Sequence, residues 1–420
     1  MYRFAPSPTG DIHIGSLRVA LFNFICAKQS GDMFIVRIED TDKEKNIEGK
    51  DQEILDILAI FGITYDALYY QSENFKYHLQ FASFLMDKKK AFACFCTKKE
   101  LKTDKYSGKC LHVSDEELLN NNLPFTIRIK KPVKNITFTD TIQGELSFSG
   151  DDVDSFIIME KDKYPTYNFA CATDDMVQGI KYIIREEEHL SNTPKQELVR
   201  QVLGYDEKIR YAHLPIILNT NGKKMSRHDD ANNVKWLLNQ GFMPEAIINY
   251  LLLLGNDTPI EIFSLDEAIK WFELEKLSKL PVLFDIDKLK SINREHIKRV
   301  EDVELSKRIG YSCANIGKLA KLYTEKFSTT AEIKEKIDTI FAPKSSEKYK
   351  DELLTLKSIV KNAPYFEEFK EFEAYLETES GLKEENFIKP LKILLSGEEN
   401  GPSLDSLYPQ IKNYLQEISS

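Results

Sequence analysis

The chain begins with MYRFAPSPTGDIHIGSLRVALFNFI, residues 1–25, and this stretch decides the fold class. Residues 2–5 are short and extended, a turn rich in proline and glycine follows them, and apolar residues then recur at helical spacing. Residues 33–38 alternate as a second strand would, and residues 53–61 repeat apolar side chains with the helical period before Gly62. This order predicts an α/β fold built on a Rossmann-like parallel sheet, in which ligands bind beyond the carboxyl ends of the strands.

The organisation of the chain changes after this first sheet segment. Short β-rich runs replace the helical period from residue 91, and strand and helix signals alternate again from residue 156. From residue 234 onward the pattern is almost wholly helical. We therefore predict an α+β insertion within the sheet domain, followed by all-helical C-terminal domains. The predicted boundaries are 1–90 and 156–218 for the two halves of the Rossmann-like domain, 91–155 for the insertion, 219–300 for a polar loop with the region after it, and 301–420 for a terminal helical region.

Composition and charge exclude several classes of protein. At 420 residues the chain has the length of about three domains of roughly 150 residues each. Its 57 basic and 67 acidic side chains give a formal charge of −10, which argues against non-specific coating of nucleic acid, so we expect no DNA partner. We find neither a signal peptide nor an apolar run of the roughly 20 residues that a membrane span needs. Six cysteines are too few for a disulfide framework, so we expect a soluble protein of the reducing cytoplasm with no membrane partner.

Two polar segments carry the chemistry of a phosphate site. His13 and Gly15 stand where the first predicted strand is followed by a helix, whose free N–H groups and positive dipole end favour a polyphosphate. Gly15 lets a ligand approach the backbone closely, and the His13 imidazole can bond phosphate oxygens. The segment 223–230 adds clustered cations, which can hold departing phosphates. The simpler alternatives are a histidine that only caps its helix and a solvated basic turn.

Together these segments resemble the motifs of bacterial glutamyl-tRNA synthetases, which are class I aminoacyl-tRNA synthetases. Residues 3–10 and 13–15 match the opening motif of that family closely, and Lys224-Met225-Ser226 begins its flexible catalytic loop. Further matching blocks are 37–42, 164–170 and 184–194, with a weaker one at 389–391. The resemblance spans nearly the whole chain, and it is specific over about the first 260 residues.

The resemblance implies a role for each matching residue. Glutamate has two carboxylates and an ammonium, and an arginine guanidinium binds a carboxylate through two hydrogen bonds. By resemblance, Arg3 and Tyr167 face the side-chain carboxylate, Arg185 the α-carboxylate, and Ser7 and Glu39 the ammonium. The implied ATP-binding residues are His13, Gly15, Glu188, Lys224 and Ser226, and the implied catalytic residues are His13, Lys224 and Arg227.

The implied reaction has two steps. The glutamate α-carboxylate attacks the α-phosphate of ATP, which gives glutamyl-adenylate and pyrophosphate, and glutamate then passes to the 3′-terminal adenosine of tRNA as AMP leaves. Positioning and electrostatics dominate such displacements, with Mg²⁺ bound to ATP. The resemblance further implies that the insertion binds the tRNA acceptor end, that the helical C-terminal region reads the anticodon, and that the protein is a monomer. Where the family commonly has Lys-Arg after the loop serine, this chain has Arg227-His228, and we predict altered handling of ATP.

A second group of residues predicts a metal site. Cys94-x-Cys96 and Cys110-x-His112 are two tight pairs that can close a tetrahedral zinc site of the structural kind. Some members of the family carry zinc in the corresponding insertion, which favours a structural Zn²⁺. The alternative is four reduced side chains in a β-rich segment.

The sequence leaves three other functions open to different degrees. The first is a form of the enzyme that preferentially or additionally glutamylates glutamine tRNA for later amidation. The second is a non-catalytic tRNA-binding adaptor, which the presence of His13, Lys224 and the glutamate pocket disfavours. The third is a glutaminyl-tRNA synthetase. The helical patterns of residues 331–340 and 349–360 disfavour it, because such an enzyme is expected to end in β-barrels.

Overall fold

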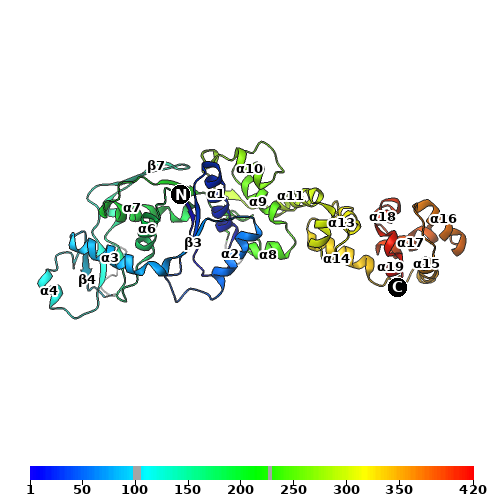
Figure 1. Ribbon diagram of the computed structural model, residues 1–420, viewed down its shortest axis with the longest axis horizontal. Helices are drawn as coiled ribbons and strands as arrows, with labels where there is room; N and C mark the ends of the chain where they lie inside the picture. Colours follow the sequence, from blue (N-terminus) through cyan, green and yellow to red (C-terminus); the bar gives the residue numbers. More distant parts are fainter. Residues whose placement is uncertain (98–105, 226–228) are drawn as a thin grey trace. The chain divides into compact units, whose positions relative to one another are not determined.

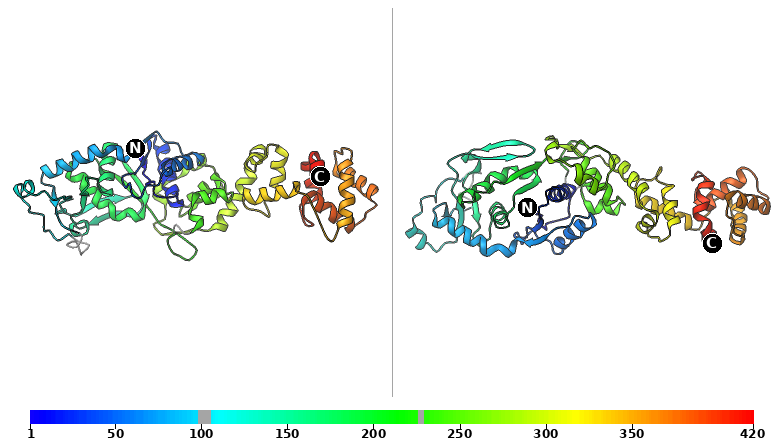
Figure 2. Two further views of the ribbon diagram at one scale, coloured as in Figure 1. Left: turned by 90° about the horizontal axis from the view of Figure 1, so that it is seen from below. Right: turned by 45° about the horizontal axis from the view of Figure 1, so that its top comes forward.

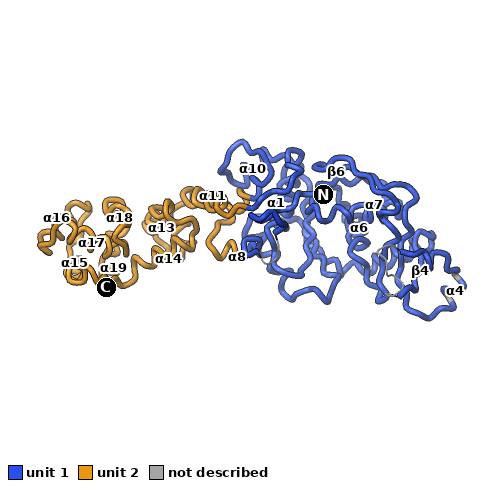
Figure 3. Tube along the Cα trace, turned by 180° about the vertical axis from the view of Figure 1, so that it is seen from behind, with its two compact units in different colours: residues 1–235, 251–284 blue, residues 236–250, 285–420 orange. Residues whose placement is uncertain are grey.

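In the computed structural model of the chain, residues 1–97, 106–225 and 229–420 are described. They form two compact units, residues 1–235 with 251–284 and residues 236–250 with 285–420 (Figure 3). Within the described residues no helix has both the length and the apolar character that crossing a bilayer requires. These divisions differ from the boundaries predicted at residues 218 and 300, because the segment 236–250 packs with the terminal helices and the segment 251–284 with the sheet domain.

The first unit is built on a seven-stranded sheet with the order β3-β2-β1-β9-β10-β6-β7. In Figures 1 and 2 this unit is coloured from blue to green along the sequence. The first six strands in this order pair in parallel, and the last strand, β7, forms an antiparallel hairpin with β6. Helices flank this sheet, α1 packing on β1 and β9 and α7 on β6, so that β1 and β2 are buried along their whole length. The predicted Rossmann-like parallel sheet is confirmed. The strand bounds are β1 Tyr2–Phe4, β2 Phe34–Ile38, β3 Ala67–Tyr70, β6 Ile136–Asp140, β7 Gly144–Phe148, β9 Tyr182–Glu186 and β10 Arg210–Leu214.

The predicted insertion, residues 91–155, does not form a single separate body. Its strands β4 (Ala91–Cys94) and β5 (Thr126–Ile129) make a small antiparallel sheet with β8 (Ile157–Met159), which lies beyond the predicted boundary. Between them the hairpin β6–β7 returns to the edge of the main sheet. The chain therefore leaves the main sheet, returns to it, and leaves again. A further pair of short parallel strands, β11 (Ile217–Leu218) and β12 (Val282–Leu283), stands apart from both sheets.

Helix α1 (Ile14–Ser30) is buried along most of its length, since apolar side chains occur on all of its faces. It begins at the N-cap residue His13 and ends at Gly31, whose φ of 68° is the left-handed conformation that glycine adopts without strain. The other helices of this unit are α2 Lys50–Ile60, α3 Phe75–Asp87, α4 Asp115–Leu119, α5 Gly150–Val153, α6 Tyr167–Val177, α7 Thr193–Val202 and α10 Leu265–Trp271. Helices α8 (Val234–Asn239) and α9 (Pro244–Leu253) contribute residues to both units.

The second unit is helical throughout its described residues, as predicted for the C-terminal region. Helix α14 (Thr330–Phe341) shows why such segments form helices. Thr329 and Glu332 make a capping box at its start, and Ile333, Ile337 and Ile340 recur at helical spacing on its buried side. The remaining helices are α11 Ile286–Arg299, α12 Asp302–Arg308, α13 Ala314–Lys321, α15 Lys350–Asn362, α16 Phe369–Ser380, α17 Glu385–Ser396, α18 Leu404–Ile411 and α19 Leu415–Ile418.

Candidate active site

A cavity of about 720 Å³ opens at the carboxyl ends of β1 and β9. Its walls come from the loop between β1 and α1, from the segment that follows β9, and from the segment 214–225. Five of the residues that the sequence assigned to the site line this cavity: Ser7, His13, Gly15, Glu188 and Lys224. The parallel sheet therefore places the site at the edge where its topology predicts a ligand.

His13 occupies the N-terminus of α1 and also caps that helix. Its Nδ1 accepts the backbone N–H of Ser16 at 3.2 Å, and its Nε2 lies 2.9 Å from the Ser16 hydroxyl. The first turn of α1 carries no acidic residue, so the positive end of the helix faces the cavity without a neutralising carboxylate of its own. His13 therefore caps a helix whose N-terminus faces the cavity.

Gly15 has almost no space for a side chain. A Cβ atom at this position would lie 2.8 Å from Oε1 of Glu186 and 3.0 Å from Nδ1 of His13. Glycine therefore allows the Glu186 and His13 side chains to pack closely against the backbone beside the helix N-terminus.

Lys224 also lines this cavity and pairs with the Glu188 carboxylate. Both side chains are about half exposed, and Met225 beside the lysine is buried. Ser226 and Arg227, which the sequence assigned to ATP binding and catalysis, lie outside the described residues, as does His228. The ion pair brings one predicted ATP-binding cation to the cavity, and an incoming phosphate would compete with Glu188 for it.

A smaller cavity of about 160 Å³ adjoins the first, and both are lined by Ser7, His13 and Glu188. Its walls contain all five residues that the sequence assigned to glutamate, which come from five different segments of unit 1: Arg3, Ser7, Glu39, Tyr167 and Arg185. The guanidinium groups of Arg3 and Arg185 are almost fully buried in the protein. From these five residues the structure brings two cations, one carboxylate and two hydroxyls to a cavity of small-molecule size, which Glu186 and Glu188 also line.

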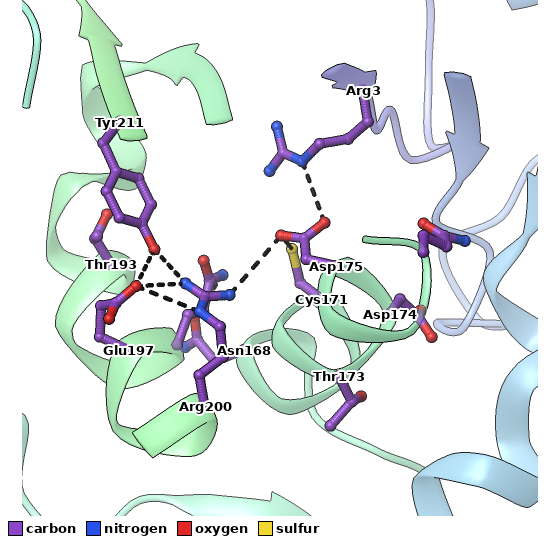
Figure 4. A network of polar contacts seen from close by, with 12 residues as sticks. Arg3, Asn168, Cys171, Thr173, Asp174, Asp175, Thr193, Glu197, Arg200 and Tyr211 are labelled. Atoms are coloured by element: carbon purple, nitrogen blue, oxygen red, sulfur yellow. Dashed lines mark hydrogen bonds and ion pairs between the residues drawn. The ribbon is translucent and has the colours of Figure 1, made fainter. Parts of the chain in front are cut away.

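Asp175 holds Arg3 in this wall (Figure 4). Oδ1 of this carboxylate accepts hydrogen bonds from Nε of Arg3 at 3.2 Å and from Nη1 of Arg37 at 2.8 Å. Its Oδ2 lies 4.0 Å from Nη1 of Arg200. Burial alone would raise the pKa of Asp175, but the three guanidinium groups outweigh it and hold that pKa at about 2. Asp175 is therefore a permanent anion that fixes the direction of Arg3, and no local pattern in the sequence marks it.

Glu186 is a second residue of the site that the sequence analysis did not single out, although it stands beside Arg185 in a quoted block. Its Oε1 lies 3.7 Å from Nδ1 of His13, and its side chain lines both cavities. Burial, followed by the nearby Glu188 carboxylate, raises the pKa of Glu186 to about 7. The site therefore contains a carboxyl group that changes its charge near neutral pH.

Three of the four predicted metal ligands lie together in the insertion. The Sγ atoms of Cys94, Cys96 and Cys110 are all within 4.8 Å of one another, and the three side chains are buried. His112 is exposed and does not belong to this group. The Tyr106 hydroxyl lies at the edge of the cluster, where it accepts the Cys110 N–H at 2.6 Å. Three clustered thiols are a donor set that suits a zinc ion.

Comparison with known proteins identifies the family. Residues 1–291 match the model for the catalytic domain of class I tRNA synthetases (E and Q), that is, those for glutamate and glutamine. The chain belongs to this family. It is therefore an enzyme of the ligase type that forms aminoacyl-tRNA, and the adaptor alternative loses its support.

Relatives of this synthetase match it over the whole length. Glutamate–tRNA ligase 2 of Sulfurimonas denitrificans is 53% identical and glutamate–tRNA ligase 1 of Campylobacter curvus is 54% identical, and each alignment covers 100% of both chains. A crystal structure of a glutamate tRNA ligase from Elizabethkingia meningosepticum in complex with its amino acid superposes with a TM-score of 0.83 at 27% identity. That alignment covers 99% of the synthetase and 97% of the crystallised chain.

Proposed function

We propose that this synthetase is a glutamate–tRNA ligase, which activates L-glutamate with ATP and transfers it to the 3′ end of glutamate tRNA with release of AMP and pyrophosphate. Full-length relatives at 51–54% identity carry that name. The observation that supports the proposal most strongly is the meeting of Arg3, Glu39 and Arg185 in a small cavity that adjoins the His13 cavity. Their charges complement the two carboxylates and the ammonium of glutamate.

In the proposed complex each charged group of glutamate has a partner. Arg3 and the Tyr167 hydroxyl bind the side-chain carboxylate, and Arg185 binds the α-carboxylate. Ser7 and Glu39 bind the ammonium. Burial raises the pKa of Glu39 above its usual value although Arg37 lies 3.2 Å away, and a bound ammonium would favour its ionised form. The α-carboxylate must then meet ATP from the larger cavity, which shares Ser7, His13 and Glu188 with this one.

The larger cavity supports the binding of ATP. Its triphosphate would lie against the N-terminus of α1, beside His13 and Gly15, and within reach of Lys224, which lines the same cavity. Ser226 and Arg227 would complete the phosphate contacts from the catalytic loop. Mg²⁺ bound to ATP would neutralise part of the phosphate charge. The protein groups then act by holding the α-phosphate in line with the attacking carboxylate and by stabilising the charge of the departing pyrophosphate.

Aminoacylation with separate tRNA transcripts tests this function. Radiolabelled glutamate, ATP and Mg²⁺ are supplied with either glutamate tRNA or glutamine tRNA, and glutamine serves as the control amino acid. Charging of glutamate tRNA with glutamate is the expected result. Charging of glutamine tRNA instead would establish the alternative form that feeds a later amidation, and charging of neither would refute the proposal.

We also propose that Cys94, Cys96 and Cys110 hold a structural Zn²⁺. Thiolates supply soft ligands at the distance range that such a site needs, and the ion would fix the loop between β4 and β5. Metal analysis of protein purified without chelators tests this, and well under one zinc per chain would remove it. A variant His112→Ala separates the two ligand sets, because loss of zinc in it would show that the exposed histidine moves to the metal.

The remaining parts of the proposal concern the environment of the enzyme. We expect a cytoplasmic monomer with no DNA or membrane partner, in which the insertion contacts the tRNA acceptor end and residues 301–420 read the anticodon. Light scattering coupled to size exclusion checks the monomer. Binding of tRNA by a chain truncated at residue 300 checks the terminal region, since an unchanged tRNA affinity would contradict it. In the catalytic loop, an Arg227→Lys variant with unchanged kcat and KM for ATP would refute the predicted alteration of ATP handling.

A further inference from the structure

Arg185 is held from three sides by buried protein groups. Its Nε donates to Nε2 of His213 at 3.1 Å, its Nη1 to the Gln196 amide oxygen at 2.8 Å, and its Nη2 to the Thr193 hydroxyl at 2.5 Å. A guanidinium carries five N–H groups. Three are therefore engaged by described residues, which leaves one N–H on each terminal nitrogen. Two adjacent N–H groups are what a carboxylate needs for a paired contact.

The protonation state of His213 follows from this geometry. Arginine can only donate, so Nε2 of His213 must present its lone pair to Arg185. Nδ1 then carries the proton and donates it to Oδ2 of Asp140, with 2.6 Å between the two atoms. The same oxygen also accepts the backbone N–H of His213 at 3.0 Å. The Thr193 hydroxyl oxygen accepts a hydrogen bond from Arg185. The same hydroxyl lies 2.9 Å from Nε2 of His213, and it donates to that nitrogen because Nε2 carries no proton. His213 is thus a neutral imidazole in a single tautomer.

Asp140 fixes this arrangement from the next strand. Its Oδ1 accepts the backbone N–H groups of Ile142 and Gln143, so neither the carboxylate nor the turn after β6 is free to rotate. Burial would raise the pKa of Asp140, but the hydrogen bond from His213 outweighs it and the carboxylate stays ionised. Asp140, His213 and Arg185 stand on the neighbouring parallel strands β6, β10 and β9, and His213 is in register with Arg185.

We propose that His213, oriented by Asp140, is a positioning residue that aligns the Arg185 guanidinium with the substrate carboxylate. This inference rests on the proposed binding of glutamate at Arg185. A second buried pair in the same unit shows that such pairs need not serve a site. Nε2 of His78 lies 2.8 Å from Asp174, but the other partners of Asp174 are Gln71 and Asn74, and none of these residues lines either cavity. The pair of Asp140 and His213, by contrast, contacts Arg185, which lines the smaller cavity.

The proposal predicts a selective effect on glutamate. The variant His213→Leu removes the acceptor for Nε, so that only Gln196 and Thr193 still hold the guanidinium. Misplacement of a substrate-binding group by about 1 Å costs on the order of 10- to 100-fold. We expect the KM for glutamate to rise by that factor, whereas the KM for ATP changes less than about twofold. In His213→Gln the amide oxygen can take the place of Nε2, so this variant should recover most of the affinity for glutamate.

The experiment measures pyrophosphate exchange by the full chain in the presence of tRNA, with glutamate and ATP varied separately. The control His78→Leu makes the same change in the buried pair that touches no cavity, and its KM for glutamate should stay within about twofold of the parent. Thr193→Val, which removes the hydroxyl between Arg185 and His213 with little change in shape, should raise the KM for glutamate in the same way and serves if His213→Leu does not fold.

Two results would overturn the proposal. One is an unchanged KM for glutamate in both His213→Leu and Thr193→Val, and the other is an equal rise in the His78→Leu control. Failure of the proposed function gives a different result, because the unmodified chain would then show no glutamate-dependent exchange at all. A rise in the KM for glutamate that His213→Gln reverses supports the positioning role, since a merely structural effect would not depend on the acceptor atom.

Discussion

Replacement of Glu186 by glutamine tests whether the active site contains a carboxyl group with an elevated pKa. Burial beside Glu188 raises the pKa of Glu186 from 4.5 to about 7, so the folded protein favours the protonated form. The stabilisation from that form is fully present below pH 4.5, and it is lost as the pH rises to about 7. Each pKa unit corresponds to about 1.4 kcal/mol, so the loss amounts to roughly 3 kcal/mol. A glutamine at this position stays neutral at every pH, so the variant does not suffer this loss of stability.

We therefore expect Glu186→Gln to gain stability relative to the parent between about pH 5 and about pH 8, by roughly 3 kcal/mol. Urea unfolding followed by hydrogen exchange in peptides from β1 and β9 reports on the unit that contains the residue. Glu188→Gln is the matched control. Burial would raise the pKa of Glu188, but its pairing with Lys224 outweighs that effect and lowers it, so this variant should gain nothing at high pH. A stability difference between Glu186→Gln and the parent that does not change with pH would refute the reasoning.

Four other substitutions probe features with a clear physical cost. Gly15→Ala places a methyl group 2.8 Å from the Glu186 carboxylate, and steady-state kinetics should show a higher KM for ATP with little change for glutamate. Gly317→Ala puts a Cβ 1.8 Å from the carbonyl oxygen of Asp302, and overpacking against backbone should cost about 3 kcal/mol, which a lowered Tm would reveal. Asp175→Asn removes the carboxylate that three buried arginines share, and a loss of about 3–5 kcal/mol in urea unfolding is expected. Cys94→Ser should abolish zinc in metal analysis, and retention of a full equivalent would contradict the thiol site.

The sequence predicted the part of the site around His13 and Gly15 from a local pattern. These two residues stand where a strand is followed by a helix, so their spacing alone places them at the helix N-terminus. The residues assigned to glutamate came instead from the resemblance to a known family, and the structure brings them together from separate segments. Local patterns were sufficient for the parallel sheet and for the helical C-terminal region.

The supporting contacts could not be predicted in this way. Asp140 and His213 are separated by 73 positions and meet only because β6 joins the main sheet next to β10. A short β-rich run gives no sign of the sheet to which it will belong, so residues 136–139 were assigned to the insertion. The Cys110-x-His112 spacing predicts a fourth ligand that the structure does not bring to the three thiols, since proximity along the chain does not ensure that two side chains face the same side.

The path of the chain through β4, β5, β6–β7 and β8 limits how this enzyme can be recombined with its relatives. A graft that exchanges residues 91–155 as a block transfers Asp140 together with the small sheet. The recipient would then receive a foreign partner for its own β10 strand. Chimaeras should be tolerated when the exchange stops before β6 and resumes after β7. In descent, likewise, residues 136–148 are expected to diverge with the main sheet rather than with the small sheet that surrounds them in sequence.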